Sequence, residues 1–477
     1  MYGMLSDFRN ARLGDVRLTR RLVRIAEQLH GGASDSIPRR FPSPSEQVAV
    51  YRFFGRRKVT MDALLGAHVE GTARRCGEEG GVLVLHDTTE FAFTDYGEDR
   101  EHLAQLTRNR HGFQAHCSLA VTDAEHAMPL GTLAVQPFVH RSQVQSEESA
   151  AWWAELGGIF ENEHERWMLG CRAAQDALPE GVDAIHVADR EGDSWSLLAG
   201  LHAEGLRYVI RCSARTRWVR DTTGAPGAVQ DCLLRGRRGT STVGAQVPDE
   251  PAETSKKKPG SNLQRTRRHA QLGVRWTTVE VSKPANADAG GPDIAPFATQ
   301  VVEVYEVDPP SERKATSWIL YTSEPIEDEG DAWDAVDRYR ARWVIEEFFK
   351  GIKTGVAYES RQLTTAHALL NFLAVAAVLA AELLSLRSVD RVYPDQQASL
   401  WLAPDQIEIV RRLVPEMKVP KRPTVRQVLY AIARYGGHIP QNGPPGWIVL
   451  YRGWIKIHHA VEVARALRLM PDDTGST

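Results

Sequence analysis

The chain has 477 residues and a formal net charge of -3, with 42% hydrophobic and 25% charged residues. This composition excludes a mostly disordered chain and allows two to four domains. The near-neutral sum hides segments of opposite sign. Residues 1–75 hold 14 Lys and Arg against 7 Asp and Glu, residues 411–468 hold 11 against 2, and residues 76–410 hold 33 against 50. Basic ends indicate binding of a polyanion, and an acidic middle indicates gathered carboxylates. Chance clustering of surface charge is the alternative.

The five cysteines are widely spaced and include no Cys-x-x-Cys pair. Their spacing indicates neither a disulfide framework nor a zinc site, and it favours a reducing cytoplasm. The first residues lack the apolar core of a signal peptide. The most apolar run, residues 369–381, falls short of the roughly 20 residues that span a bilayer. We therefore expect a buried helix there and no membrane partner.

The N-terminal segment has the pattern of an amphipathic helix. Apolar residues recur at helical spacing over residues 15–29, and the other side carries Arg17, Arg20, Arg21 and Arg24. Gly31 and Gly32 end this helix, prolines mark a loop, and Ser45 is the expected cap of a second helix before a basic cluster at residues 56–58. The pattern favours a small helical DNA-binding domain. An ordinary solvated arginine face is the alternative.

Two apolar runs that end on an aspartate predict buried strands. Residues 81–87 end at Asp87 and residues 184–189 end at Asp189. Between them, residues 114–121 and 128–139 read as strands and residues 147–156 as a helix. A mixed α/β sheet is the expected result.

A β-rich segment follows at about residues 206–325. Its expected strands are residues 208–212, 273–281, 299–307 and 317–322. The polar loop between them carries Lys256, Lys257, Lys258, Arg265, Arg267 and Arg268. A solvated loop is the first interpretation of these cations, and phosphate contact is the second. From Ala332 to about Leu469 the pattern is helical.

Three carboxylates from separate elements are candidates for one site: Asp87, Asp189 and Glu346. Such groups converge only if they are protonated, paired with cations or bound to metal. Hard oxygen ligands suit Mg²⁺ or Mn²⁺, and two such ions can promote phosphoryl transfer. A strand-end Asp on its own is often only a cap or turn residue.

The helical stretch around Glu346 strengthens this hypothesis. Tyr339, Arg342, Glu346 and Lys353 fall within roughly 60° of one face of a continuous helix. That face offers one carboxylate, two cations and a phenol, which suits a metal-bound Glu among phosphate donors. A surface helix with salt bridges is the alternative.

These motifs resemble a known family. The spacing Tyr339-x2-Arg342-x3-Glu346-x6-Lys353, with HDTTEF around Asp87 and DREGDSW from Asp189, is similar to that of the DDE transposases of the bacterial insertion-sequence-four family. The likeness extends to LGDVRLTRRLVRIAEQL at 13–29, AVYRFFGRRKVT at 49–60, SWILYTSEP at 317–325 and LYAIARYGGHI at 429–439. It therefore runs along essentially the whole chain in order.

The resemblance implies an α/β fold with an RNase H-like catalytic core. Residues 71–365 would form this core, with the β-rich insertion at about 206–325. Residues 1–70 would be a helical DNA-binding domain, and residues 366–477 a helical dimerisation domain. Asp87, Asp189 and Glu346 would be the catalytic triad and would bind two Mg²⁺ ions, for which Mn²⁺ substitutes.

The resemblance also implies the DNA contacts and the reaction. Tyr339, Arg342 and Lys353 would contact terminal phosphates, Trp318 would stack on a flipped base, and Arg211 would contact DNA. A homodimer would bind inverted-repeat ends in the bacterial cytoplasm, cleave them through a hairpin and join the 3'-hydroxyl ends to target DNA. The alternatives are a structure-specific RNase H-like nuclease and a non-catalytic DNA-binding regulator of transposition.

Overall fold

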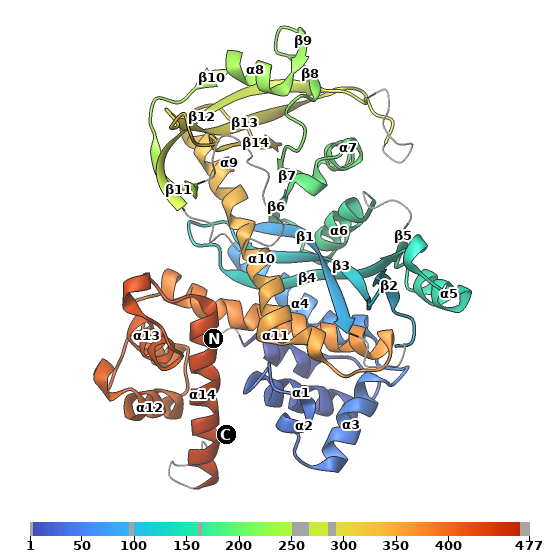
Figure 1. Cartoon of the computed structure of the whole chain (residues 1–477), viewed down its shortest axis with the longest axis vertical. Helices are drawn as coiled ribbons and strands as arrows, with labels where there is room; N and C mark the ends of the chain where they lie inside the picture. Colours follow the sequence, from blue (N-terminus) through green and yellow to red (C-terminus); the bar gives the residue numbers. More distant parts are fainter. Residues whose placement is uncertain (1–2, 95–99, 161–164, 250–266, 285–291, 468–477) are drawn as a thin grey trace.

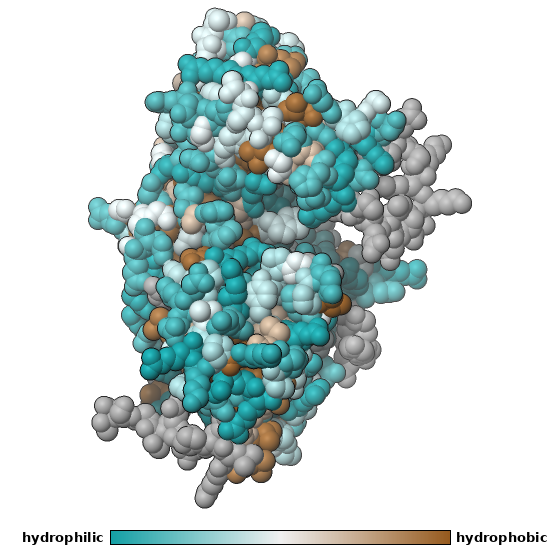
Figure 2. All heavy atoms as spheres, turned by 90° about the vertical axis from the view of Figure 1, so that its left-hand side faces the viewer, coloured by the Kyte–Doolittle hydropathy of each residue, from teal (hydrophilic) through white to brown (hydrophobic). Residues whose placement is uncertain are grey.

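The structure is a computed structural model, and it describes residues 3–94, 100–160, 165–249, 267–284 and 292–467. Figure 1 shows a long sheet in the upper part of the molecule, with the helical N-terminal and C-terminal regions below it. Figure 2 shows that the side on the left of Figure 1 is mostly hydrophilic, with apolar side chains in small separate patches.

The N-terminal region is helical, as predicted. Asp15 caps the first α-helix by accepting a hydrogen bond of 2.8 Å from the amide of Arg17, and Leu22, Ile25 and Leu29 are buried. The prediction that Ser45 caps the second helix is wrong. The second long helix begins at Pro44 with Ser43 as its cap residue, because proline suits the first helical position, where its missing N–H is not needed. The elements are η1 (Met4–Asn10), α1 (Val16–His30), α2 (Ile37–Arg40), α3 (Pro44–Phe54) and α4 (Met61–Glu79).

A mixed sheet confirms the α/β class. β1 (Gly81–Thr94), β3 (Arg110–Thr122) and β4 (Pro129–His140) form the predicted antiparallel meander, with short β2 (Ala104–Thr107) and β5 (Ile159–Phe160) at its margins. On the other side of β1, β6 (Asp183–Ala188) and β7 (Arg207–Arg211) run parallel to it. The intervening helices are α5 (Glu147–Glu155), α6 (Glu165–Ala177) and α7 (Trp195–Ala203).

The β-rich segment continues this same sheet. β14 (Ser317–Thr322) pairs with β7, and β13 (Phe297–Val307) and β12 (Arg267–Val281) follow in order. The four predicted strands are thus confirmed, in a sheet of 14 strands among the described residues. The smaller elements are β8 (Trp218–Asp221), β9 (Pro226–Ala228), α8 (Val229–Arg235), β10 (Arg237–Arg238) and β11 (Val243–Pro248).

The polar loop before β12 divides between described and undescribed residues. Lys256, Lys257, Lys258 and Arg265 lie outside the described residues. Arg268 lies in β12, and its guanidinium forms an ion pair with the buried Glu306. Because this guanidinium already pairs with a carboxylate of the neighbouring strand β13, phosphate contact by Arg268 is not favoured.

The C-terminal third is helical and partly enters the main core. α11 (Ala366–Val392) packs against β4 and α4. By length and composition it could cross a membrane, but it is buried inside the protein. The remaining helices are α9 (Glu329–Ala341), α10 (Trp343–Lys350), α12 (Pro404–Leu413), α13 (Val425–Tyr435) and α14 (Trp447–Ala466). The short turns are η2 (Arg141–Gln143), η3 (Arg190–Gly192), η4 (Gly351–Gly355), η5 (Tyr358–Ser360), η6 (Ala398–Leu400), η7 (Pro415–Met417) and η8 (Pro440–Asn442).

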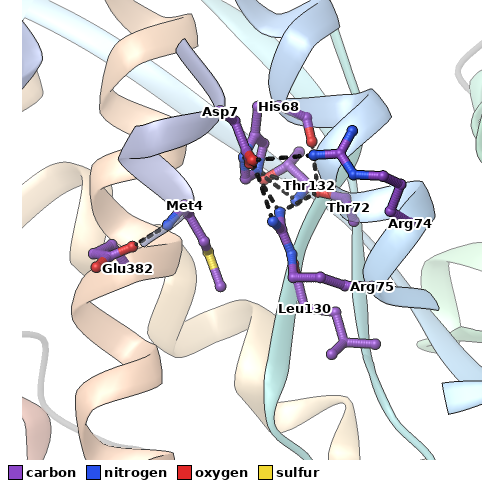
Figure 3. Close-up of polar contacts among 9 residues, drawn as sticks. All are labelled: Met4, Asp7, His68, Thr72, Arg74, Arg75, Leu130, Thr132 and Glu382. Carbon is purple, nitrogen blue, oxygen red and sulfur yellow. Dashed lines mark hydrogen bonds and ion pairs between the residues drawn. The ribbon is translucent and has the colours of Figure 1, made fainter. Parts of the chain in front are cut away.

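The first turn of the chain is anchored on the core. The amide of Met4 donates a hydrogen bond of 2.6 Å to Glu382 of α11, and Asp7 contacts both His68 and Arg75 of α4 (Figure 3). These contacts are buried. They fix η1, and through it the start of α1, against the helices that cover the sheet.

Candidate nucleic-acid and metal site

Asp87 lies within β1 and not at its end. β3 pairs with β1 from Val82 to Thr94, and this pairing extends the strand past Asp87. The predicted strand end is therefore wrong for β1. The parallel neighbour β6, however, pairs with β1 only as far as Leu85. Asp87 thus stands just beyond the carboxyl end of β6, where ligands commonly bind at parallel strands.

Asp189 follows β6 directly, as predicted. It caps η3, because its carboxylate accepts a hydrogen bond of 2.8 Å from the amide of Glu191. Its side chain is partly exposed. Its negative charge contributes to a raised pKa of Asp87. The first two predicted acids are therefore neighbours at one edge of the sheet.

The third acid, Glu346, is linked to Asp87 by Arg342. Arg342 stands at the junction of α9 and α10. Its guanidinium donates a hydrogen bond of 2.9 Å to Asp87 and forms an ion pair with Glu346, one turn further along. Only 11% of the Arg342 side chain is exposed. One buried cation therefore joins a carboxylate of β1 to a carboxylate of α10.

The electrostatics of this cluster show competing charges. Burial raises the pKa of Asp87 to about 6; Arg342 opposes this rise, and Asp189 and Glu191 add to it. For Arg342, burial acts to lower the pKa, but the nearby Asp87, Tyr339, Asp189 and Glu346 outweigh it and raise the pKa. A site with this excess of carboxylate over cation favours binding of further positive charge.

Three more predicted residues lie together, around Tyr339 in the last turn of α9 before Arg342. The ring centroids of Trp318 and Tyr339 are 6.1 Å apart. The guanidinium carbon of Arg211 lies 5.9 Å from the Trp318 ring centroid and 6.0 Å from that of Tyr339. These residues come from β7, β14 and α9. The strands β7 and β14 therefore bring a cation and an aromatic ring to Tyr339 of α9.

Lys353 lies beyond a change in the expected helix. The sequence predicts one continuous helix, but residues 351–355 form a π turn, which changes the angular spacing. The ammonium nitrogen of Lys353 lies 5.6 Å from the ring centroid of Phe91. Phe91 follows Asp87 by four residues on β1, which is about 13 Å along a strand. The ammonium group of Lys353 is therefore placed over the ring of Phe91, four residues beyond Asp87 on β1.

The N-terminal arginines line a separate groove. Arg17, Arg20 and Arg21 are exposed on α1, and Arg24 forms an ion pair with Glu46 of α3. The groove between these helices has a volume of about 470 Å³. All four arginines line it. A cationic groove of this kind suits a phosphate backbone.

A comparison with protein families identifies this region. Residues 4–59 match the transposase DNA-binding family. The match spans η1, α1, α2 and α3, including the whole arginine groove. It supports a transposase and DNA as its partner. The family match thus supports the prediction that the helical N-terminal region binds DNA.

Sequence reasoning missed some residues beside the acids. Arg166 of α6 donates a hydrogen bond of 3.2 Å to Thr88 and lies 3.8 Å from a carboxylate oxygen of Glu191. Thr88 and Glu191 stand next to predicted acids in the sequence and could have been found there. Arg166 carries no such signal, because only the packing of α6 on the sheet brings it to this edge.

Proposed function

We propose that the protein is a cut-and-paste DNA transposase of the DDE type, related to the insertion-sequence-four family. One observation carries the proposal: a chain that begins with a transposase DNA-binding domain also brings acids from β1 and α10 onto one arginine, beside a third acid after β6. DNA binding and a carboxylate site are the two parts that a DNA-cutting enzyme needs.

The strand order supports an RNase H-like core. The order β4-β3-β1-β6-β7 places three antiparallel strands beside two parallel ones. The parallel strands β6 and β7 are connected through α7. The proposed catalytic residue Asp87 lies on β1, the central strand of this order, and Asp189 directly follows its neighbour β6.

The donor set fits two Mg²⁺ ions. Asp87, Asp189 and Glu346 offer only carboxylate oxygens, the hard ligands that Mg²⁺ and Mn²⁺ prefer. The guanidinium already between Asp87 and Glu346 and the raised pKa of Asp87 both indicate a place that favours added positive charge. When bound, the ions would activate a water or 3'-hydroxyl and stabilise the leaving oxygen.

The chain's other residues would bind and orient the DNA. Arg342 can exchange a carboxylate for a terminal phosphate, since guanidinium binds either group in bidentate fashion. Tyr339 would donate to the same phosphates. Trp318 would stack on a flipped base, with Arg211 beside it. Lys353 would contact the phosphate backbone of the DNA further from the acids.

The helical ends would complete the complex. The groove of Arg17, Arg20, Arg21 and Arg24 would bind the inverted-repeat end. Residues 366–477 would pair two protomers, so that a homodimer holds both ends and then joins them to target DNA.

A cleavage assay with matched variants tests this function. The substrate is a labelled duplex of the inverted repeat that borders the reading frame, incubated with Mn²⁺. Glu346→Gln should abolish nicking and keep end binding, because it removes a metal ligand and leaves the arginine groove intact. The control is Glu347→Gln, the next residue of α10, which pairs instead with Arg387. It should nick at the wild-type rate.

The products distinguish the other functions. Nicks without hairpins or joined ends would indicate a structure-specific nuclease. Binding without any nicking by the wild-type chain would indicate a regulator. Wild-type cleavage by Glu346→Gln would exclude this acid from catalysis.

A further inference from the structure

A second cluster of metal-ligating side chains lies on the other face of the sheet. His86 precedes Asp87, and adjacent residues of a strand point to opposite faces. His86 Nε2 lies 2.8 Å from His186 Nδ1 of β6 and 3.7 Å from Cys171 Sγ of α6. The three ligand atoms lie within 4.8 Å of one another, and all three residues are buried.

The outer nitrogens of both imidazoles are held by oxygens. His86 Nδ1 lies 3.1 Å from the hydroxyl of Ser118, and His186 Nε2 lies 3.3 Å from the side-chain carbonyl of Gln175. Metal-binding histidines are commonly oriented in this way by a partner of the second nitrogen. Gln175 stands one helical turn after Cys171, so α6 supplies both a ligand and an orienting group. The inner nitrogens thereby face each other, and His86 Nε2 also faces the thiol of Cys171.

We propose that His86, His186 and Cys171 form a binding site for Zn²⁺ or a similar thiophilic divalent cation. Two imidazoles and one thiolate are a ligand set that zinc accepts, with a fourth position left for water. Tetrahedral zinc places its nitrogen and sulfur ligands about 3.3 to 3.6 Å apart. The observed sulfur–nitrogen separation of 3.7 Å is close to this range, and the nitrogen pair at 2.8 Å must open by about 0.5 Å.

The protons balance when the cation binds. Gln175 accepts from His186 Nε2–H, so His186 Nδ1 carries a lone pair and accepts from His86 Nε2–H. On binding, the His86 proton moves to Nδ1 and is donated to Ser118. The Cys171 thiol loses its proton to solvent. One proton is therefore released for each ion bound.

The site would fasten the elements that carry the acids. Its ligands come from β1, β6 and α6, and Asp87 and Asp189 lie on β1 and directly after β6. Such a cross-link would be structural. It is independent of the proposed transposase function, since none of its ligands belongs to the acid cluster.

Cobalt spectroscopy tests the site directly. The full-length chain is used with Asp189→Asn and Glu346→Gln, which removes binding at the acid cluster. After treatment with a chelator, titration with Co²⁺ should give a thiolate-to-cobalt absorption band that saturates at one ion per chain and disappears when Zn²⁺ is added. Calorimetry in buffers of different ionisation enthalpy should report one proton released.

The cysteine variants decide the assignment. Cys171→Ser should lose the band, and Cys171→Ala provides a second test if the serine variant does not fold. Cys232→Ser is the matched control, because Cys232 is another buried free cysteine, on α8, and it should keep the band. A folded chain with no thiolate band, or a band that survives the loss of Cys171, would overturn the proposal and leave a purely hydrogen-bonded trio.

Discussion

Glu382 is predicted to make the stability of the protein depend on pH near neutrality. It lies in the middle of α11 with 2% of its surface exposed, and it accepts the hydrogen bond from Met4 that anchors η1 (Figure 3). Burial raises its pKa from the ordinary 4.5 to about 7, against the smaller opposing effects of the Met4 amide and Arg75. The carboxyl is therefore protonated in the folded chain at pH 5.

The sign and size of the effect follow from linkage. A folded-state pKa above the unfolded value gives stability that is complete below pH 4.5 and is lost as the pH rises through 7. Each pKa unit corresponds to about 1.36 kcal/mol. A shift of about 2.5 units therefore amounts to about 3 kcal/mol at pH 8.

Glu382→Gln keeps an oxygen acceptor for the Met4 amide but cannot ionise. Because the wild type has already lost about 1 kcal/mol of this stability at pH 5, the variant should gain about 2.5 kcal/mol on it between pH 5 and pH 8. For a cooperative unit of this size, that gain corresponds to about 2 to 3 °C in Tm. Scanning calorimetry of both chains at the two pH values measures the difference.

Because both chains share the other titrating groups, the effects of those groups on Tm cancel in the comparison with wild type. A surface variant serves as the control. Glu155→Gln, at the exposed end of α5, should show the same Tm difference from wild type at both pH values. If the Tm difference of Glu382→Gln is also unchanged between pH 5 and pH 8, the carboxyl does not titrate in this window and the reasoning is refuted.

Three further predictions concern the DNA and metal sites. Arg342→Ala or Lys353→Ala should each reduce the salt slope of end affinity by about 1, because one phosphate contact is lost; an unchanged slope in a filter-binding titration would argue against that contact. Trp318→Ala should weaken hairpin formation by about 1 to 3 kcal/mol while nicking survives better; equal loss of both products on a sequencing gel would indicate a packing role. Mn²⁺ affinity measured by electron paramagnetic resonance should fall as the pH drops through about 6, where Asp87 becomes protonated, and a flat profile from pH 5 to 8 would contradict the raised pKa.

Local pattern predicted much of the fold. α1 and β6 were predictable because each has the periodicity or apolar run of its element and a polar residue at its boundary, Asp15 before α1 and Asp189 after β6. Their boundaries are set by neighbouring residues. The length of β1 was not predictable in this way, since pairing with β3 carries the strand on to Thr94.

The position of Lys353 shows a second limit. Gly351 lies so close to α11 that an added Cβ would meet Ala380 Cβ at 3.1 Å. This close packing accompanies the π turn in which Lys353 lies, and the turn interrupts the α-helical spacing. Helical periodicity counted along the sequence assumes an unbroken helix, so it cannot register such a contact.

By itself the sequence determined the class of the fold and the basic N-terminal helices, and it supplied the three candidate acids, because each rests on the pattern of neighbouring residues. Only the tertiary structure decided that Arg342 joins Asp87 to Glu346, and that Cys171 meets two histidines 100 residues apart. Cysteine spacing indicated no metal site, because these ligands come from two paired strands and the helix packed on them. Sheet pairing and helix packing create such neighbours, and no local spacing records them.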